Sequence, residues 1–116
     1  MSYVDGFVVP VPTHKKEEYR EMCARAAEVF KEHGAIKLVE CWGDDVPDGK
    51  VTDFKGAVKA EAGETVVFSW IVWPSKAVRD AGHPEVVKDP RMQFGADMPF
   101  DGKRMIYGGF DVLFES

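Results

Sequence analysis

The sequence predicts a single α+β domain, built on one antiparallel sheet that helices cover on one face only. Three observations support this prediction. Strand-like and helix-like segments alternate along the chain, short stretches rich in glycine, proline and aspartate join them, and the strand-like segments are apolar on both sides. The chain has 116 residues, 45% of them apolar and 30% charged, without a biased tract. We therefore expect residues 1–116 to form one folding unit.

The amino-terminal part begins with a strand and an amphipathic helix. Residues 3–11 are rich in β-branched and aromatic side chains, which indicates the first strand. Thr13 is placed to cap the helix that follows, and Gly34 is placed to end it. Apolar residues recur at helical spacing between them: Tyr19, Met22, Cys23, Ala26, Val29 and Phe30. A second strand is expected over residues 36–42.

The middle of the chain is predicted to hold a loop and two strands. Turn-forming residues crowd positions 43–50. Residues 54–60 favour a short additional strand, and residues 65–73 form the most apolar strand of the chain. The sheet therefore receives its most apolar strand from this region.

The carboxy-terminal part is predicted to repeat the helix–strand order. Ser75 begins a second helix, which the stretch 82–84 (Gly-His-Pro) interrupts, and a final strand runs over residues 104–114. Short connections and right-handed crossovers then reduce the main elements to a ferredoxin-like sheet with two main helices on one face.

The other face of this sheet is predicted to need a cover. Residues 7–9, 66–68 and 70–73 are apolar on both sides of their strands. No predicted helix remains for the second face, and soluble monomers tolerate apolar patches of only a few hundred Å². We therefore expect a homodimer in which two sheets pack face to face, which is a dimeric α/β barrel.

Charge and cysteine usage restrict the partners and the compartment. With 20 acidic and 15 basic residues, the net charge of −5 argues against binding to nucleic acid. The chain shows neither a secretion signal nor an apolar run long enough for a membrane span. Cys23 and Cys41 lack CxxC spacing, and we expect both to be reduced thiols in a reducing compartment. A cytoplasmic protein is the expectation.

Three stretches carry a family resemblance: residues 39–54, residues 98–110 and residues 3–9. With these, the chain resembles the YbaA-like bacterial proteins, a family of unknown function in the dimeric α/β-barrel superfamily. The resemblance implies the same dimeric fold and contributes no catalytic residues. Distant members of that superfamily include cofactor-independent monooxygenases, isomerases, haem-handling proteins and ligand-sensing domains, so the fold does not select a chemistry.

No metal or cofactor site is expected. Residues 44–55 resemble a calcium loop, but Val46 and Lys55 stand where that loop needs oxygen ligands. The three histidines lack a second ligand at metal-binding spacing on their own elements: His14, His33 and His83. The acidic loop at 44–53 is instead expected to be a solvated turn or a lid over a pocket.

Polar side chains within apolar strands are the candidates for a site. Such residues lie at a sheet edge, form ion pairs or line a wet pocket. The candidate pocket contains Asp5, Glu40, Trp42, Trp70, Arg104 and Tyr107. It would bind or convert a small, partly aromatic metabolite, with Glu40 or Asp5 as the acid or base and Arg104 as a clamp for an anionic group.

Two points stay open at this level. The catalytic residues are unknown, and a non-catalytic module for ligand sensing or protein interaction, using loop 44–53, remains the alternative. If Asp5 and Arg104 lie side by side in neighbouring strands, they form one fixed charge pair.

Overall fold

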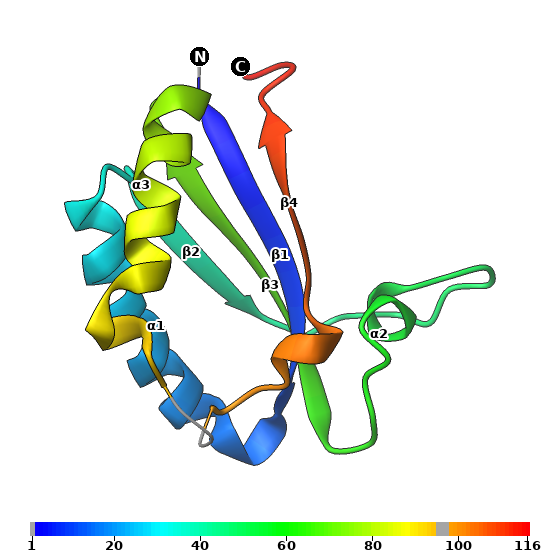
Figure 1. The fold of residues 1–116 in the computed structure, drawn as a ribbon. Helices are drawn as coiled ribbons and strands as arrows, with labels where there is room; N and C mark the ends of the chain where they lie inside the picture. The colour runs from blue at the N-terminus through cyan, green and yellow to red at the C-terminus, as the bar shows by residue number, and fades with distance from the viewer. Residues whose placement is uncertain (1, 95–97) are drawn as a thin grey trace.

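The fold is known from a computed structural model that describes residues 2–94 and 98–116. The main elements follow one another in the order strand, helix, strand, short helix, strand, helix, strand (Figure 1). They are β1 (Tyr3–Pro12), α1 (Lys16–Glu32), β2 (Lys37–Trp42), α2 (Phe54–Ala57), β3 (Glu64–Trp73), α3 (Lys76–Lys88) and β4 (Ile106–Asp111).

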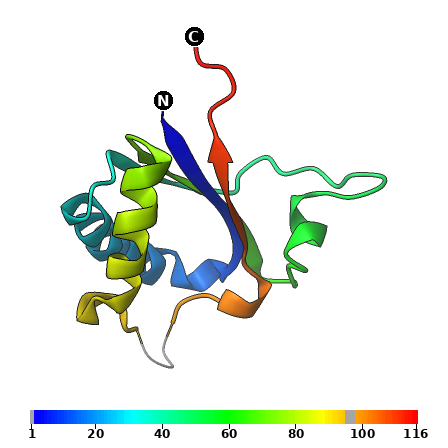
Figure 2. The ribbon, with the colours of Figure 1, turned by 45° about the horizontal axis from the view of Figure 1, so that its top comes forward.

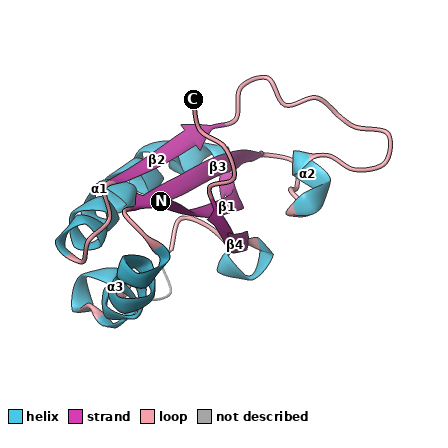
Figure 3. Ribbon diagram, turned by 90° about the horizontal axis from the view of Figure 1, so that it is seen from above, coloured by secondary structure: helices cyan, strands magenta, loops and turns pink. Residues whose placement is uncertain are grey.

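The four strands form one antiparallel sheet in the order β2-β3-β1-β4. Both long helices, α1 and α3, lie on the same face of this sheet, as the view from above shows (Figure 3). This is the predicted ferredoxin-like arrangement, because each helix carries the chain across a neighbouring strand before it re-enters the sheet. Strands β1 and β3 occupy the centre.

The core lies between the sheet and the two helices. The residues of α1 that recur at helical spacing are all buried: Tyr19, Met22, Cys23, Ala26, Val29 and Phe30. They pack against the alternate residues of the central strands that point to the same side, among them Val9, Val11, Val67, Ile71 and Trp73. Gly34 ends this helical region with a φ of 109°, which favours glycine, as predicted.

The structure corrects the expected cap of α1. Thr13 does not cap the helix; it opens a short 3-10 turn, Thr13–Lys15, that precedes α1. Its hydroxyl is 2.7 Å from the hydroxyl of Thr65, so it joins the start of the helical region to β3.

The expected short strand at residues 54–60 is wrong. The side chain of Asp53 accepts a hydrogen bond from the backbone N–H of Gly56 at 2.6 Å, and the helix α2 starts there. A capping aspartate satisfies an amide that a helix start otherwise leaves unpaired, and it overrides the weak strand preference of the next residues.

The second long helix is not interrupted where the sequence suggested. Ser75 caps α3 as predicted, accepting a hydrogen bond from Val78 at 3.2 Å, but the helix continues through Pro84 to Lys88. Gly82 lies against Trp73 and the backbone carbonyl of His33, an approach too close for a larger residue. This packing holds the helix in place despite the hydrogen bond that proline cannot donate.

The last strand is shorter than expected. Residues Gly102–Arg104 form a 3-10 turn in which Asp101 accepts a hydrogen bond from the backbone of Lys103 at 3.0 Å. The strand β4 starts only at Ile106. Arg104 is therefore a turn residue, and this changes the pairs it can form.

The sheet face opposite the helices is largely bare. Val58 and Ala60, which follow α2, cover Val8 and Val66 at one end. Elsewhere large apolar side chains stay accessible, with 45% of Phe68 exposed. The loop that leads to α2 and the C-terminal tail both project from the sheet (Figure 2). Within the described residues, no helix is long and apolar enough to span a membrane.

Candidate functional site

The six predicted site residues do not form one pocket. Trp70 lies on the bare face of the sheet, Asp5 under α3, and Arg104 in the turn before β4. Glu40 and Trp42 share a small hollow beside α1. Tyr107 lies opposite Phe7 in the edge strand β4 and is 78% exposed. The structure therefore offers several separate candidate sites.

Asp5 is held by a buried ion pair with Arg79 of α3. Nη2 and Nε of Arg79 donate to the Asp5 carboxylate at 2.8 and 3.1 Å, and Nε1 of Trp73 donates at 2.9 Å. The guanidinium also lies 5.2 Å from the ring centroid of Tyr3. The hydrogen bonds that Arg79 donates to Asp5 raise the pKa of Arg79. The expected pairing of Asp5 with Arg104 is therefore wrong.

Arg104 is fully engaged elsewhere. Its Nη1 and Nη2 each donate to one oxygen of Glu64 at 2.7 Å, and its Nε donates to Asp101 at 2.9 Å. Nη1 also reaches the carbonyl of Lys59 at 3.0 Å. Arg104 lowers the pKa of Glu64. This arginine joins the turn before β4 to the start of β3 and is not a free clamp for a ligand.

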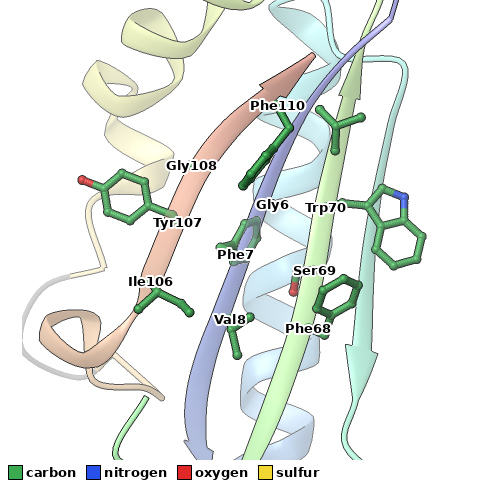
Figure 4. Close-up of a pocket in the computed structure, with 11 residues that line it drawn as sticks. Gly6, Phe7, Val8, Phe68, Ser69, Trp70, Ile106, Tyr107, Gly108 and Phe110 are labelled. Carbon is green, nitrogen blue, oxygen red and sulfur yellow. The ribbon is translucent and has the colours of Figure 1, made fainter. Parts of the chain in front are cut away.

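The bare sheet face contains a hollow of about 630 Å³. Gly6 of β1 and Gly108 of β4 are partners in the sheet. Because glycine has no side chain, the backbone at these two residues forms the floor of the hollow. Phe110 leans over this floor, and Trp70 and Phe68 line the other side (Figure 4). Because no acidic, lysine, arginine or histidine side chain of the described residues lines it, this surface suits packing rather than acid–base chemistry.

A groove of about 510 Å³ runs between α3 and β4. Asp5, Arg79, His83 and Tyr107 contribute its polar atoms. The Arg79 guanidinium already pairs with Asp5 and, at 3.1 Å, with Asp80. The charges in this groove are thus satisfied by the protein itself.

The hollow beside α1 differs from the other two because a carboxyl group without a cationic partner among the described residues lines it. Glu40 of β2 pairs with Ser69 of β3 across the sheet, and Tyr19 of α1 approaches it from above. The hydroxyls of Tyr19 and Ser69 both donate to the same oxygen of Glu40, Oε1, the former at 2.8 Å. Among the described residues, no ion pair involves Glu40. A carboxyl group is thus held by neutral donors alone.

The surroundings shift the acidities of this cluster. Burial raises the pKa of Glu40, and the hydrogen bonds from Ser69 and Tyr19 oppose this only in part. Burial, together with the charge of Glu40, raises the pKa of Tyr19 and raises that of Cys23 to about 12. Cys23 is therefore a neutral thiol rather than a nucleophile, and Glu40, whose pKa lies above the ordinary glutamate value, is the member of this cluster suited to exchange a proton.

The hollow itself measures about 160 Å³. Trp42, Tyr19 and Val67 provide its apolar walls, and Lys16 and Arg20 of α1 line it as well. The ammonium of Lys16 lies 5.3 Å from the ring centroid of Trp42. The space is thus bounded by a carboxyl group, a flat aromatic wall and two cations.

The sequence pointed to part of this site only. Glu40 and Trp42 are two residues apart and so point to the same face of a strand, which the sequence shows. Tyr19 and Cys23, one helical turn apart, were expected in the core and instead also contact the carboxyl group. For Arg79, the partner of Asp5 at a separation of 74 residues, no sequence signal existed.

Within the described residues, no group of three or more histidine, cysteine, aspartate or glutamate side chains could hold a metal ion. Cys23 and Cys41 are both free.

Comparison with known proteins places the chain in a family. A model of a family described as "Protein of unknown function (DUF1428)" matches residues 2–102. The chain is 66% identical over 116 residues to "Uncharacterized protein YbaA" of Escherichia coli K12, with 99% of each chain covered, and equally to YbaA of Shigella flexneri.

One solved structure, of Rv0793 from Mycobacterium tuberculosis, has a similar fold. Its TM-score is 0.54 at 11% identity, covering 100% of this chain and 99% of that one. At this identity the likeness concerns the fold alone. By sequence, the chain belongs to the DUF1428 family of proteins of unknown function, together with YbaA.

Proposed function

We propose that this chain is a cytoplasmic homodimer that binds a small molecule in the hollow at Glu40 of each copy. The observation that carries the binding role is the Glu40 carboxyl group, which is partly buried, held only by neutral donors and part of a residue that lines a hollow of about 160 Å³. The two free cysteines support a reducing compartment.

A purely structural role explains this carboxyl group poorly. Burying an ionised carboxylate without a cation costs free energy, and the raised pKa of Glu40 reflects that cost. A glutamine of the same shape would accept both hydroxyl hydrogen bonds without the charge. A group that destabilises the fold but can exchange a proton or bind a donor is typical of a functional site.

The variant Glu40→Gln tests the binding role without knowledge of the ligand. We expect Glu40→Gln to be at least as stable as the wild type in urea at pH 8, because the substitution removes a buried charge and keeps the acceptor. Glu18→Gln, an exposed change on the same helix as Tyr19, is the matched control and should be neutral. A loss of more than about 1 kcal/mol in Glu40→Gln alone would assign this residue to structure.

The bare sheet face supports the homodimer. Strands β1 and β3 have 10 residues and β2 and β4 have 6. At about 3.3 Å per residue and about 4.8 Å between strands, the face covers roughly 500 Å² per copy. Two such faces bury about 1,000 Å² before the loop and the tail are added, which reaches the lower limit for a specific interface.

The tail and the loop before α2 favour a second copy as the occupant of this face. Both lie on the bare side of the sheet, opposite the helices (Figure 3). The tail residues Leu113 and Phe114 are 96% and 83% exposed, and Val51 in the loop is 99% exposed. Apolar side chains on projecting segments beside an apolar face are suited to contact a molecule packed on that face.

Light scattering tests the dimer. We expect twice the chain mass of 13.0 kDa for the wild type at micromolar concentration. Phe68→Glu places a charge on the bare face and should give monomers, whereas Val87→Glu, at an exposed apolar position on α3, should leave the dimer intact. A monomeric wild type would contradict this part of the proposal.

A further inference from the structure

The hollow at Glu40 is mainly apolar, and its lining residues include one carboxyl group, that of Glu40, and two cations, those of Lys16 and Arg20. Together these features define a class of ligand. We infer that it takes a small carboxylic acid that also carries a hydroxyl or amino group. Glu40 binds this hydroxyl or amino group, and Lys16 binds the carboxylate of the ligand. This inference rests on the binding role proposed above and specifies its ligand.

The carboxyl side of the hollow requires a hydrogen-bond donor. Tyr19 and Ser69 both donate to Oε1 of Glu40, the Cys23 thiol is a weak third donor to this carboxyl group, and among the described residues no hydroxyl, amino or amide group donates to Oε2. An ionised carboxylate only accepts hydrogen bonds. A ligand hydroxyl or amino group therefore matches the acceptor that the protein leaves available.

The walls require a short, flat or slender body. Trp42 and the ring of Tyr19 face the space together with Val67. At about 160 Å³ the hollow is smaller than the roughly 300 Å³ at which sites for drug-sized ligands begin. A ligand no larger than a single ring fits these walls.

The cationic side requires an anion. Lys16 lies over Trp42, and within the described residues it takes part in no ion pair. Arg20 lies beside it and pairs with Glu17 at 2.9 Å, so this side keeps a net positive charge on a protein whose net charge is −5. A ligand carboxylate would pair with the Lys16 ammonium, whereas the ionised carboxyl group of Glu40 would repel it.

Three matched probes test this inference. The first is 4-hydroxybenzoate, which has both groups. Benzoate lacks the hydroxyl, and phenol lacks the carboxylate. Binding is followed by tryptophan fluorescence and by thermal shift. We expect 4-hydroxybenzoate to bind about tenfold more tightly than either analogue, because only it satisfies both ends of the site. Trp42→Phe should remove most of the fluorescence change.

Two variants assign the ends of the ligand. Lys16→Met should weaken the binding of 4-hydroxybenzoate about tenfold and leave the affinity for phenol unchanged. Glu40→Gln should reduce the preference of the protein for 4-hydroxybenzoate over benzoate. Glu18→Gln should change neither. Equal affinity for all three probes, no effect of Lys16→Met, or no binding at millimolar concentration would overturn the inference. The proposed binding role is judged separately, by the stability of Glu40→Gln without ligand.

Discussion

The substitution Arg79→Met tests the buried ion pair that joins α3 to β1. In the wild type, Nε and Nη2 of Arg79 and the indole nitrogen of Trp73 all donate to Asp5, a residue that is only 8% exposed. Methionine has a similar length and no charge. The substitution therefore leaves the Asp5 carboxylate buried. Among the described side chains, only the indole N–H of Trp73 would still donate a hydrogen bond to it.

The expected loss follows from this geometry. Removing one partner of a buried pair costs about 3 to 5 kcal/mol. The side chain of Arg79 is 26% exposed, so water can reach part of the site, and we expect the lower end, about 3 kcal/mol. For a chain of 116 residues this corresponds to a fall of roughly 12 °C in the melting temperature.

The assay is urea and thermal unfolding of a double-mutant cycle at a fixed protein concentration, because a dimer's stability depends on concentration. Asp5→Asn in the Arg79→Met background removes the unpaired charge and should recover most of the loss. A loss below about 1 kcal/mol for Arg79→Met, or the absence of recovery in the double variant, would refute the reasoning.

Three further predictions concern other parts of the molecule. Arg104→Met leaves the Glu64 carboxylate without its bidentate partner and should cost about 2 to 3 kcal/mol by urea unfolding; no loss would contradict the pairing. The pKa of Glu40 is raised in the folded state, so its contribution to stability is full below the unfolded value of about 4.3 and is lost as pH rises through the folded value. Urea unfolding should therefore show Glu40→Gln gaining on the wild type as the pH rises from below about 4.3 to pH 8, and a constant difference would contradict this. Deleting residues 113–116, which include Leu113 and Phe114, should raise the concentration at which the proposed dimer dissociates in sedimentation, and an unchanged value would exclude the tail from the proposed interface.

The sheet and the long helices could be predicted because their patterns are local and long. The helical spacing from Tyr19 to Phe30 recurs over several turns, and all six positions are buried. The strand at Glu64–Trp73 differs from the expected segment by one residue at its start. Over such lengths, the burial of apolar side chains outweighs local exceptions.

The errors arose where one side chain decides the local structure. Asp53 caps α2 and converts an expected strand into a helix, and Asp101 caps the turn that removes Arg104 from β4. In α3, the contact of Gly82 with Trp73 holds a helix that Pro84 was expected to break. Such capping and packing contacts depend on neighbours that the pattern of apolar residues does not encode.

The sequence indicated which polar residues lie in apolar surroundings, but it did not predict which residues they pair with. Asp5, Glu40 and Arg104 are partly or fully buried charged residues, as polar groups set into apolar strands suggested. Their partners come from elements far away in sequence: Arg79 is 74 residues from Asp5, and Tyr19 is 21 residues from Glu40. These pairings depend on how the helices rest on the sheet, which no single segment specifies.

The most direct test of the account is the titration of Glu40 itself. In protein labelled with ¹³C at glutamate carboxyl carbons, the Glu40 signal is assigned by its loss in Glu40→Gln and followed by NMR between pH 3 and pH 9. Burial without a cationic partner predicts a midpoint above the ordinary value of about 4.3. A midpoint at or below that value would show a carboxylate stabilised by the fold and would contradict the proposed site.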